Sequence, residues 1–348
     1  MLNPRPAVLS MAPYHPPTGN RADKLRLDFN ENTVGCSPAV IEALRRALTP
    51  EALTIYPDYA AARLKLASYF QVDEREILLT NGTDEAIQVL INTYVDDPDE
   101  VIQLRPSYAM YRFYAEVAGA RVIDVPYAAP ALEFPLEAVL NAIKPATRAI
   151  LISNPNNPTG TATTVDCIER ILRAAPQAAV LIDEAYHEFC GITALAKIGE
   201  FRNLFVSRTF SKAYGMAAMR MGCLFSHAAN IEYMHKTQSQ YSVNALAVVA
   251  AQAAIEDSTY LLKYIRESHN AQDVLYAGLR RLGIQYVQSS ANFVLGYFGS
   301  RAVEVRDALR EKAILVRDRS YEIPGGIRIT VGTCEQARRV IAELERIW

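Results

Sequence analysis

Half of the 348 residues are hydrophobic, so the chain can bury a sizeable core, and its length suits one large domain with a smaller one. The formal net charge of −2 excludes the strongly basic profile of a nucleic-acid or anionic-membrane partner. The five cysteines lie far apart without any C-x-x-C, so neither a zinc site nor a redox pair is indicated and we expect no metal.

The N-terminus lacks a basic region followed by an apolar core, so no secretion signal is visible. The longest apolar stretch, Ala245 to Ile255, is short and contains Gln252, which favours a buried helix over a membrane span. We therefore expect a soluble cytoplasmic protein.

The proline-rich first 26 or so residues read as an extended arm rather than a folded unit. Ser37-Pro38 opens a helix, because serine caps a helix and proline fits its first turn, and a second helix is predicted from Asp58 through Phe70. Strand and helix patterns then alternate. Strands are predicted at Ile77–Leu79, Val101–Leu104, Arg121–Val125, Ala149–Ser153, Ala179–Ile182 and Leu204–Val206, and helices at Gly82–Tyr94, Ser107–Ala118 and Thr164–Ala174.

This alternation predicts an α/β fold with a mostly parallel sheet and helices on both faces. The pattern changes near residue 240, where one long helical stretch runs to about Leu282. After it we expect a strand at Phe293–Tyr297, a helix at Val303–Glu311, strands near Ile314 and Ile327, and a C-terminal helix, which together suggest a smaller α+β domain. The predicted division is an N-terminal arm (1–28) joining the small domain, a large domain (29–240) and a small domain (241–348).

The most informative segment surrounds Lys212, in the run Arg-Thr-Phe-Ser-Lys-Ala-Tyr that follows the last strand of the alternation. Thr209 and Ser211 can donate to phosphate oxygens, and Arg220 offers the paired donors that match a phosphate. A lysine that forms an imine with an aldehyde cofactor must be held still beside such a phosphate site. The segment therefore indicates pyridoxal 5′-phosphate, against the alternative of a solvated lysine on a loop.

Three further motifs follow predicted strands, where open parallel sheets place their ligands. Thr80-Asn81-Gly82-Thr83-Asp84-Glu85 turns into a helix whose N-terminus suits a phosphate, although taken alone an ordinary capped helix explains it better. Asn154-Pro155-Asn156-Asn157-Pro158-Thr159-Gly160 forms a rigid loop in which Asn157 can donate to an aromatic hydroxyl. In Asp183-Glu184-Ala185-Tyr186, an ionised Asp183 suits a pyridinium nitrogen and Tyr186 the ring's phenolic oxygen.

Two tyrosines extend the set. Tyr108 can stack on a cofactor ring, and Tyr56, in Ile-Tyr-Pro-Asp, can reach a phosphate across a subunit boundary. For either tyrosine alone, core packing or a surface turn is the better explanation. The chain has no G-x-G-x-x-G, so the usual dinucleotide fingerprint is absent.

Together these motifs resemble the fold-type I PLP-dependent aminotransferases, and more narrowly the histidinol-phosphate aminotransferase family. The resemblance covers nearly the whole chain, from Pro13-Tyr14 and Asn30-Glu31-Asn32 to the segment Arg328–Thr333. The resemblance to the superfamily rests on the motifs N-P-N-N-P-T-G, D-E-A-Y and S-K-A…R-x-G. The resemblance to the narrower family rests on the early P-Y and N-E-N, the Y-P-D, and the late V-R-D-R and I-R-I-T-V-G-T.

The resemblance implies a role for each matching residue. Lys212 holds the cofactor aldehyde and then shuttles a proton, Asp183 pairs with the pyridine nitrogen, and Tyr186 and Asn157 hold the ring oxygen, with Tyr108 stacked on the ring. The residues implied at the cofactor phosphate are Gly82, Thr83, Asp84, Thr209, Ser211 and Arg220, with Tyr56 from the other subunit of a homodimer. The residues implied at the substrate are Tyr14, Asn30, Glu31, Asn157, Arg317 and Arg328.

The chain departs from the family at three places: Thr33 follows N-E-N where proline is common, Ala217-Ala218 stand where A-G is common, and the loop between Asp318 and Arg328 is short. These departures bear on the substrate and not on the cofactor.

The predicted reaction is transamination of L-histidinol phosphate with 2-oxoglutarate, giving imidazole acetol phosphate and L-glutamate in histidine biosynthesis. One pocket must then accept a phosphate and a dicarboxylate in turn, and arginine grips both bidentately. Arg317 and Arg328 suit this double duty, whereas we expect Arg319 to be surface charge. The alternatives are an aromatic or broad-range aminotransferase, a PLP lyase such as a phosphothreonine decarboxylase, a PLP cyclase, and a catalytically silent module on the same fold.

Overall fold

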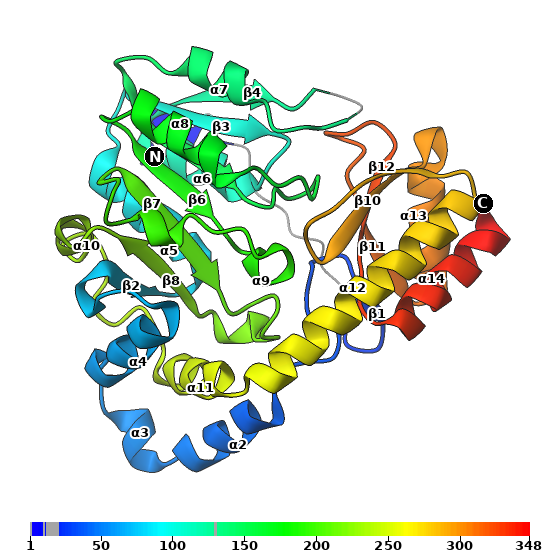
Figure 1. Ribbon diagram of the computed structural model, residues 1–348, viewed down its shortest axis with the longest axis horizontal. Helices are drawn as coiled ribbons and strands as arrows, with labels where there is room; N and C mark the ends of the chain where they lie inside the picture. Colours follow the sequence, from blue (N-terminus) through cyan, green and yellow to red (C-terminus); the bar gives the residue numbers. More distant parts are fainter. Residues whose placement is uncertain (1, 10, 12–20, 129–130) are drawn as a thin grey trace.

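The computed structural model describes residues 2–9, 11, 21–128 and 131–348 (Figure 1). Its larger part is built on a seven-stranded sheet of order β2-β8-β7-β6-β5-β3-β4. Strands β3 to β7 pair in parallel, and β8 is antiparallel to both β2 and β7. The strands are β2 Ile77–Thr80, β3 Glu100–Arg105, β4 Arg121–Pro126, β5 Thr147–Ser153, β6 Ala179–Asp183, β7 Leu204–Thr209 and β8 Gly222–Ser226. The mostly parallel sheet is confirmed, and β8 is an addition that the sequence analysis missed.

Both faces of this sheet are buried under helices. Along β5, Ile150 and Ile152 join one hydrophobic core while Ala149 and Leu151 join another, because side chains alternate along a strand. The helices of the large part are α2 Pro38–Ala47, α3 Pro50–Thr54, α4 Ala60–Phe70, α5 Gly82–Tyr94, α6 Ala109–Ala118, α7 Leu136–Ala142, α8 Val165–Ala174, α9 His187–Cys190, α10 Ala228–Met234 and α11 Ala245–Glu256.

A second, five-stranded sheet has the order β1-β11-β12-β10-β9. Its strands are β1 Leu25–Leu27, β9 Gln285–Val287, β10 Phe293–Tyr297, β11 Ile314–Asp318 and β12 Gly326–Thr330, and α12 Ser258–Arg281, α13 Ala302–Glu311 and α14 Cys334–Ile347 pack with it. Helices α12 and α14 approach closely at Gly278, where an added Cβ would lie 2.4 Å from Ile341. Strand β1 pairs in parallel with β11, so the N-terminal segment returns to the C-terminal sheet (Figure 1).

The long helical stretch predicted to about Leu282 consists of two helices, and the prediction for the arm is corrected. Helices α11 and α12 are separated at Asp257, whose side chain caps α12 by accepting from the Tyr260 amide, and they meet at 79°. The arm expected to be extended contains a short helix, α1 Pro6–Leu9, which lies near α6 while Arg5 donates to the carbonyl of Val117.

Helix starts also shift by two residues. The helix predicted from Asp58 begins at Ala60, because the Asp58 carboxylate accepts from the Ala60 amide ahead of the first turn. The helix predicted from Ser107 begins at Ala109, with Tyr108 in extended conformation as its N-cap. Helix α11, beyond the division expected at residue 240, packs against α2 and α4 of the large part.

Within the described ranges, no single helix is long and apolar enough to cross a membrane, and only the sharply bent α11–α12 pair passes on length and composition together. The same residues contain no group of three or more His, Cys, Asp or Glu side chains arranged to hold a metal ion.

Candidate active site

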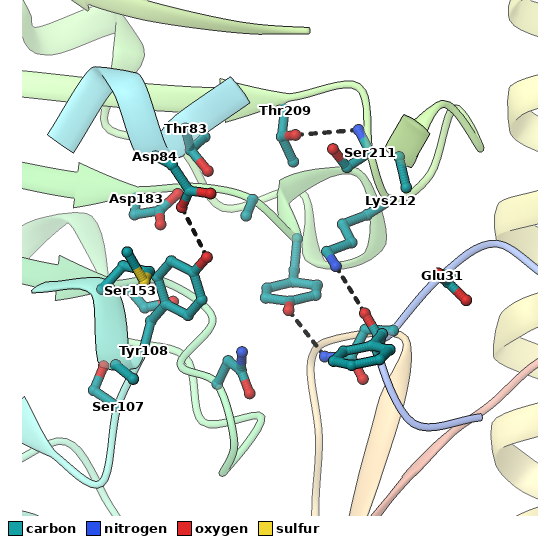
Figure 2. Close-up of a pocket in the computed structure, with 18 of the residues that line it drawn as sticks. Glu31, Thr83, Asp84, Ser107, Tyr108, Ser153, Asp183, Thr209, Ser211 and Lys212 are labelled. Carbon is teal, nitrogen blue, oxygen red and sulfur yellow. Dashed lines mark hydrogen bonds between the residues drawn. The ribbon is translucent and has the colours of Figure 1, made fainter. Parts of the chain in front are cut away.

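A cavity of about 250 Å³ lies at the carboxyl ends of β5, β6 and β7, where the large sheet faces β11, β12 and the segment after β1 (Figure 2). Of the residues predicted to bind cofactor or substrate, its lining includes Asn30, Glu31, Thr83, Asp84, Tyr108, Asn157, Asp183, Tyr186, Thr209, Ser211, Lys212, Arg220, Arg317 and Arg328. Motifs far apart in the sequence therefore meet in one place, while the roles given to the individual residues stay predictions.

Lys212 stands just beyond the end of β7 and points into the cavity (Figure 2). Its ammonium Nζ donates to the backbone carbonyl of Phe29 at 2.9 Å and lies 5.9 Å from the centre of the Tyr186 ring. It makes no ion pair with a described carboxylate. Burial, and after it the positive charge of Arg328, together lower the pKa of Lys212 to about 8, so the free, nucleophilic amine is accessible near neutral pH.

Asp183 ends β6 and is buried with neutral partners only. Tyr111 donates its hydroxyl to Oδ2 at 2.8 Å, and Ser207, the register partner on β7, donates to Oδ1 at 2.9 Å. Burial raises the pKa of Asp183 to about 6, although both hydrogen bonds act against that rise. A carboxylate in such surroundings is stabilised by any cation brought beside it, which is the property that a pyridinium partner requires.

Neither Tyr111 nor Ser207 was predicted from the sequence. Ser207 was identifiable in principle, because it follows the predicted strand Leu204–Val206 just as Asp183 follows the predicted strand Ala179–Ile182, and the two residues are register partners. Tyr111 lies on α6 three residues after Tyr108, at the spacing that puts two side chains on one helical face.

The N-terminus of α5 and the segment from Thr209 to Arg220 form a polar cradle at one end of the cavity. Arg220 donates from Nη1 to the Ser211 hydroxyl at 3.3 Å and pairs through Nη2 with Asp84 at 3.4 Å. Its guanidinium lies against the backbone of Gly82, where an added Cβ would stand 2.4 Å from Nη2, and the φ of +76° at Gly82 is one that glycine adopts readily and other residues rarely do. Thr209 Oγ1 accepts from the Ser211 amide at 3.1 Å.

The cradle combines free backbone amides, a helix N-terminus, hydroxyls and a guanidinium, which is the usual donor set for a phosphate. Arg220 itself has a left-handed φ of 56°, a conformation that non-glycine residues rarely adopt outside constrained sites. Gly82 is not among the lining residues, and it contributes by letting Arg220 approach.

Tyr108 and Asn157 lie on the cavity wall with partners of their own. The Tyr108 hydroxyl donates to Asp84 at 2.8 Å, and burial together with the Asp84 charge raises the Tyr108 pKa well above its usual value, so the phenol stays protonated. The side-chain oxygen of Asn157 accepts from Arg328. Asn157 therefore connects the loop after β5 to the arginine expected to bind substrate.

Asn30 also bridges the two sheets. Its side-chain amide donates to the Tyr186 hydroxyl at 2.9 Å, and its oxygen accepts from the Thr330 hydroxyl at 3.2 Å. It is buried and has a left-handed φ of 57°, which asparagine tolerates better than most residues. Asn30 thus orients Tyr186, in addition to facing the cavity.

Three arginines gather at the opposite end of the cavity from the cradle. Arg317 and Arg328 are register partners on β11 and β12, and Arg328 is buried, donating to Asn157 and to the backbone carbonyl of Asp28. Arg319, expected on the surface, is instead only 8% exposed and lines the cavity. That expectation was wrong because residues two apart in extended backbone point to the same side, so Arg319 follows Arg317 inward.

Three predicted residues stand apart. Glu31 reaches the rim of the cavity, but its carboxylate is paired with Arg21 at 3.0 Å and Arg26 at 3.2 Å. Tyr56 is 75% exposed, lies outside the cavity, and packs on the Tyr241 ring at 4.5 Å between centroids. Tyr14 lies outside the described residues.

A buried ion pair braces the large sheet behind the cavity. Glu184 follows Asp183 and Arg208 precedes Thr209, so both project from the face opposite to their active-site neighbours. Arg208 Nε donates to Glu184 at 2.7 Å, and Glu184 also accepts from the Ala194 amide and the Thr193 hydroxyl. Breaking such a pair leaves an uncompensated buried charge, so it fixes the ends of β6 and β7 relative to each other.

The cavity fits the cofactor expected from the sequence. It offers a phosphate cradle, a buried carboxylate without a cationic partner, an aromatic wall at Tyr108 and an amine with depressed pKa. These four features match the phosphate, ring nitrogen, ring face and aldehyde of pyridoxal 5′-phosphate.

Comparison with known proteins agrees with this geometry. The family model for aminotransferase class I and II matches residues 22–344. The chain is 36% identical to a histidinol-phosphate aminotransferase of Symbiobacterium thermophilum, over 99% of this chain and 98% of that protein. It is 33% identical to a histidinol-phosphate aminotransferase of Geobacillus sp. (strain WCH70), over 93% of this chain and 90% of that protein.

Among solved structures, the histidinol-phosphate aminotransferase of Sinorhizobium meliloti in complex with pyridoxal-5′-phosphate is similar with a TM-score of 0.88. The match covers 98% of this chain and 96% of that chain at 22% sequence identity, so it bears on the fold alone. It confirms the predicted fold-type I architecture.

Proposed function

Since the chain belongs to the aminotransferase class I and II family, and within it to the histidinol-phosphate aminotransferases, we propose that it transaminates L-histidinol phosphate with 2-oxoglutarate. The products are imidazole acetol phosphate and L-glutamate, the cofactor is pyridoxal 5′-phosphate, and the reaction belongs to histidine biosynthesis.

One observation carries this proposal: a single cavity has a phosphate cradle and an amine on one wall and buried arginines on the other. Lys212 and Arg328 both line this cavity. Asn157, a neutral residue, connects the two walls because its side-chain oxygen accepts a hydrogen bond from Arg328. A cofactor site and an anion site thus share one space, as a reaction on an anionic amino donor requires.

On the large-domain wall, the residues assigned to the cofactor are Lys212 at the aldehyde, Asp183 at the ring nitrogen, Tyr186 and Asn157 at the ring oxygen, Tyr108 at the ring face, and Gly82, Thr83, Asp84, Thr209, Ser211 and Arg220 around the phosphate. When bound, pyridoxal 5′-phosphate supplies an electron sink for the charge that develops at the substrate Cα.

The protein's own groups supply the proton handling and the orientation. Asp183, buried and ionised beside a cation, holds the proton at the ring nitrogen. Lys212 Nζ, with its pKa near 8, accepts the proton that leaves the substrate Cα and returns it, because a base with a pKa near the operating pH is the most effective. Asn30 keeps the Tyr186 hydroxyl in place through its hydrogen bond.

On the opposite wall, Arg317 and Arg328 bind the anionic end of each substrate. Arg328 is buried and its described partners are neutral oxygens, so its charge awaits an anion. A phosphate and a carboxylate present similar oxygen pairs to a guanidinium, which lets one site serve both half-reactions. Tyr14 and Glu31 are assigned to this end by family likeness.

We further propose a cytoplasmic homodimer. Exposed apolar side chains cluster in and after α3, where Leu53, Ile55 and Tyr56 are 64%, 62% and 75% exposed, and the Tyr241 ring continues the patch. Burial of this patch by a second copy would bring Tyr56 toward the partner's cofactor phosphate. Sedimentation analysis gives the test: a monomer at micromolar concentration would contradict the homodimer.

The proposed substrate is tested by single-turnover reaction of the cofactor-loaded protein with L-histidinol phosphate, L-phenylalanine, L-tyrosine and phosphothreonine, following the loss of cofactor absorbance. We expect histidinol phosphate to react at least about 100-fold more efficiently than phenylalanine, since each charge-assisted contact to an arginine contributes roughly 1.5–3 kcal/mol. A wide preference for phenylalanine would mean an aromatic aminotransferase, and release of carbon dioxide from phosphothreonine would mean a lyase.

A further inference from the structure

The anion-binding end of the cavity carries more positive charge than its surroundings neutralise. Within the described ranges, Arg328 bonds to two neutral oxygens, the Asn157 side-chain oxygen and the Asp28 backbone carbonyl. Arg317 lies over the Phe29 ring, with 5.6 Å from its guanidinium carbon to the ring centre. Neither arginine pairs with a carboxylate among the residues that the structure describes. These two guanidiniums alone therefore offer two positive charges to a ligand.

Arg319 differs because it already has a counter-ion. Its Nη2 pairs with Glu322, three residues on, and its guanidinium lies 5.1 Å from the centre of the Tyr321 ring. Its Nε is buried without an acceptor. The arginine is thus held by one carboxylate at the cavity rim while a second donor of the same guanidinium remains unused.

The three guanidiniums influence one another. The pKa of Arg328 is lowered to about 10, chiefly by burial and in smaller part by the charges of Arg319 and Arg317. Mutual repulsion of this kind is relieved by a ligand with more than one negative charge, and it is aggravated when no anion is present.

From these contacts we propose that Arg319 is a specificity-determining residue that selects dianionic substrates, with Glu322 as the carboxylate it leaves in order to bind them. This inference rests on the proposed function and deepens it. A phosphate monoester carries about two negative charges above pH 7, so it attracts Arg319 more strongly than the single charge of Glu322 does. A ligand with one negative charge offers nothing beyond Glu322, and with such a ligand Arg319 stays in its ion pair.

The backbone around Arg319 does not depend on its side chain. The Arg319 amide donates to Gly326 at 2.8 Å, and the Arg319 carbonyl accepts from Ile323 at 2.8 Å and from Glu322 at 3.0 Å. Replacing the side chain therefore leaves the turn between β11 and β12 intact, and the effect on ligand binding can be separated from an effect on folding.

The test compares L-histidinol phosphate with L-histidinol, which has a hydroxyl in place of the phosphate. In the cofactor-loaded protein at pH 8, Arg319→Gln should raise KM for histidinol phosphate about 10- to 100-fold while changing kcat/KM for histidinol less than about 3-fold, as expected for loss of a charge-assisted contact. The matched control is Arg310→Gln, an exposed arginine on α13 outside the cavity lining, which should change neither.

Two further measurements separate selection of charge from a structural ion pair. At pH 5.5 the phosphate ester carries about one charge, so the defect of Arg319→Gln should shrink to within about 3-fold. Glu322→Gln, which removes the competing carboxylate, should keep or lower KM for histidinol phosphate. Equal loss on both substrates, a defect independent of pH, or a Glu322→Gln defect as large as that of Arg319→Gln would each overturn the proposal.

The proposed function and this inference can fail independently. If the unmodified protein does not turn over histidinol phosphate, the substrate assignment fails, but calorimetric binding of inorganic phosphate to the cofactor-loaded protein still tests Arg319. At pH 8 we expect Arg319→Gln to weaken phosphate binding at least about 10-fold and to leave formate binding unchanged. Unchanged phosphate binding would refute the role of Arg319 whatever the substrate.

Discussion

The two walls of the cavity are built differently. On the large-domain wall, polar side chains pair with one another: Asp183 with Tyr111 and Ser207, and Arg220 with Ser211 and Asp84. On the wall formed by β11, β12 and the segment after β1, Arg328 and Asn30 instead bond across the cavity, and Arg317 pairs with no carboxylate among the described residues, while Arg319 pairs with Glu322. Arg328 bonds to Asn157, and Asn30 to Tyr186.

The difference matches what each wall is proposed to bind. A cofactor presents the same groups in every turnover, so a wall whose donors and acceptors are already fixed costs no reorganisation. The two substrates of a transamination differ, so the other wall benefits from charge without a fixed partner. The large-domain wall is also braced from behind by the Arg208–Glu184 pair.

The largest expected effect belongs to Lys212, the residue that contacts both walls. Lys212→Ala should lower turnover at least about 10⁴-fold, since it removes both the amine that holds the cofactor and the group that moves the proton. Among the described residues its side chain bonds to the Phe29 carbonyl alone, so the free energy of unfolding should change by no more than about 1 kcal/mol, measured by thermal unfolding. Substantial residual transamination in this variant, measured at saturating cofactor, would refute the assignment.

A pair of arginine variants tests the division between the walls directly. Arg220→Ala should weaken cofactor binding about 10- to 100-fold and leave substrate KM nearly unchanged once the cofactor is saturating, because Arg220 belongs to the phosphate cradle. Arg328→Ala should raise substrate KM about 10- to 100-fold and leave cofactor binding nearly unchanged. Cofactor titration and steady-state kinetics on both variants provide the measurement. Equal loss of cofactor and substrate binding in Arg328→Ala would mean that this arginine is structural.

A smaller effect concerns stability. Burial raises the pKa of Asp183 from 3.8 to about 6, so the carboxyl contributes stability that is present below pH 4 and lost as the pH rises through 6. In the cofactor-free protein at pH 8, Asp183→Asn should therefore be about 1–3 kcal/mol more stable than the unmodified protein, at about 1.4 kcal/mol per pKa unit.

Denaturant unfolding of both proteins at pH 4 and pH 8 measures this difference. Most of the gain should disappear at pH 4, where folded Asp183 is protonated and about half of the unfolded carboxyls are protonated as well. An asparagine variant that is less stable at pH 8, or a difference that does not depend on pH, would show that the buried Asp183 carboxylate does not destabilise the cofactor-free protein.

The residues of the large-domain wall could be grouped from the sequence because the information that groups them is local. Thr83, Asp183 and Lys212 each follow a recognisable strand, and parallel strands bring their carboxyl ends to one edge. The opposite wall depends on pairing between distant segments. Asn30 donates to Tyr186 and accepts from Thr330, at sequence separations that no local pattern encodes.

The misses have the same origin. Strand β8 is antiparallel in an otherwise parallel run, so the alternation of strands and helices gave no place for it. Arg319 was assigned to the surface because of its charge alone. Its spacing of two residues from Arg317, which places both side chains on the same side of the chain, was not considered. The break between α11 and α12 had a local signal, Asp257 before Ser258, which a continuous apolar pattern obscured.

The proposed function depends on a covalent bond between the cofactor and the amine of Lys212. Borohydride reduction of the cofactor-loaded protein, followed by digestion and mass spectrometry, locates that bond. We expect a single pyridoxyl group on the peptide that contains Lys212, and none after reduction of the Lys212→Ala variant. A label on another lysine, or a protein that binds the cofactor without any reducible bond, would contradict it.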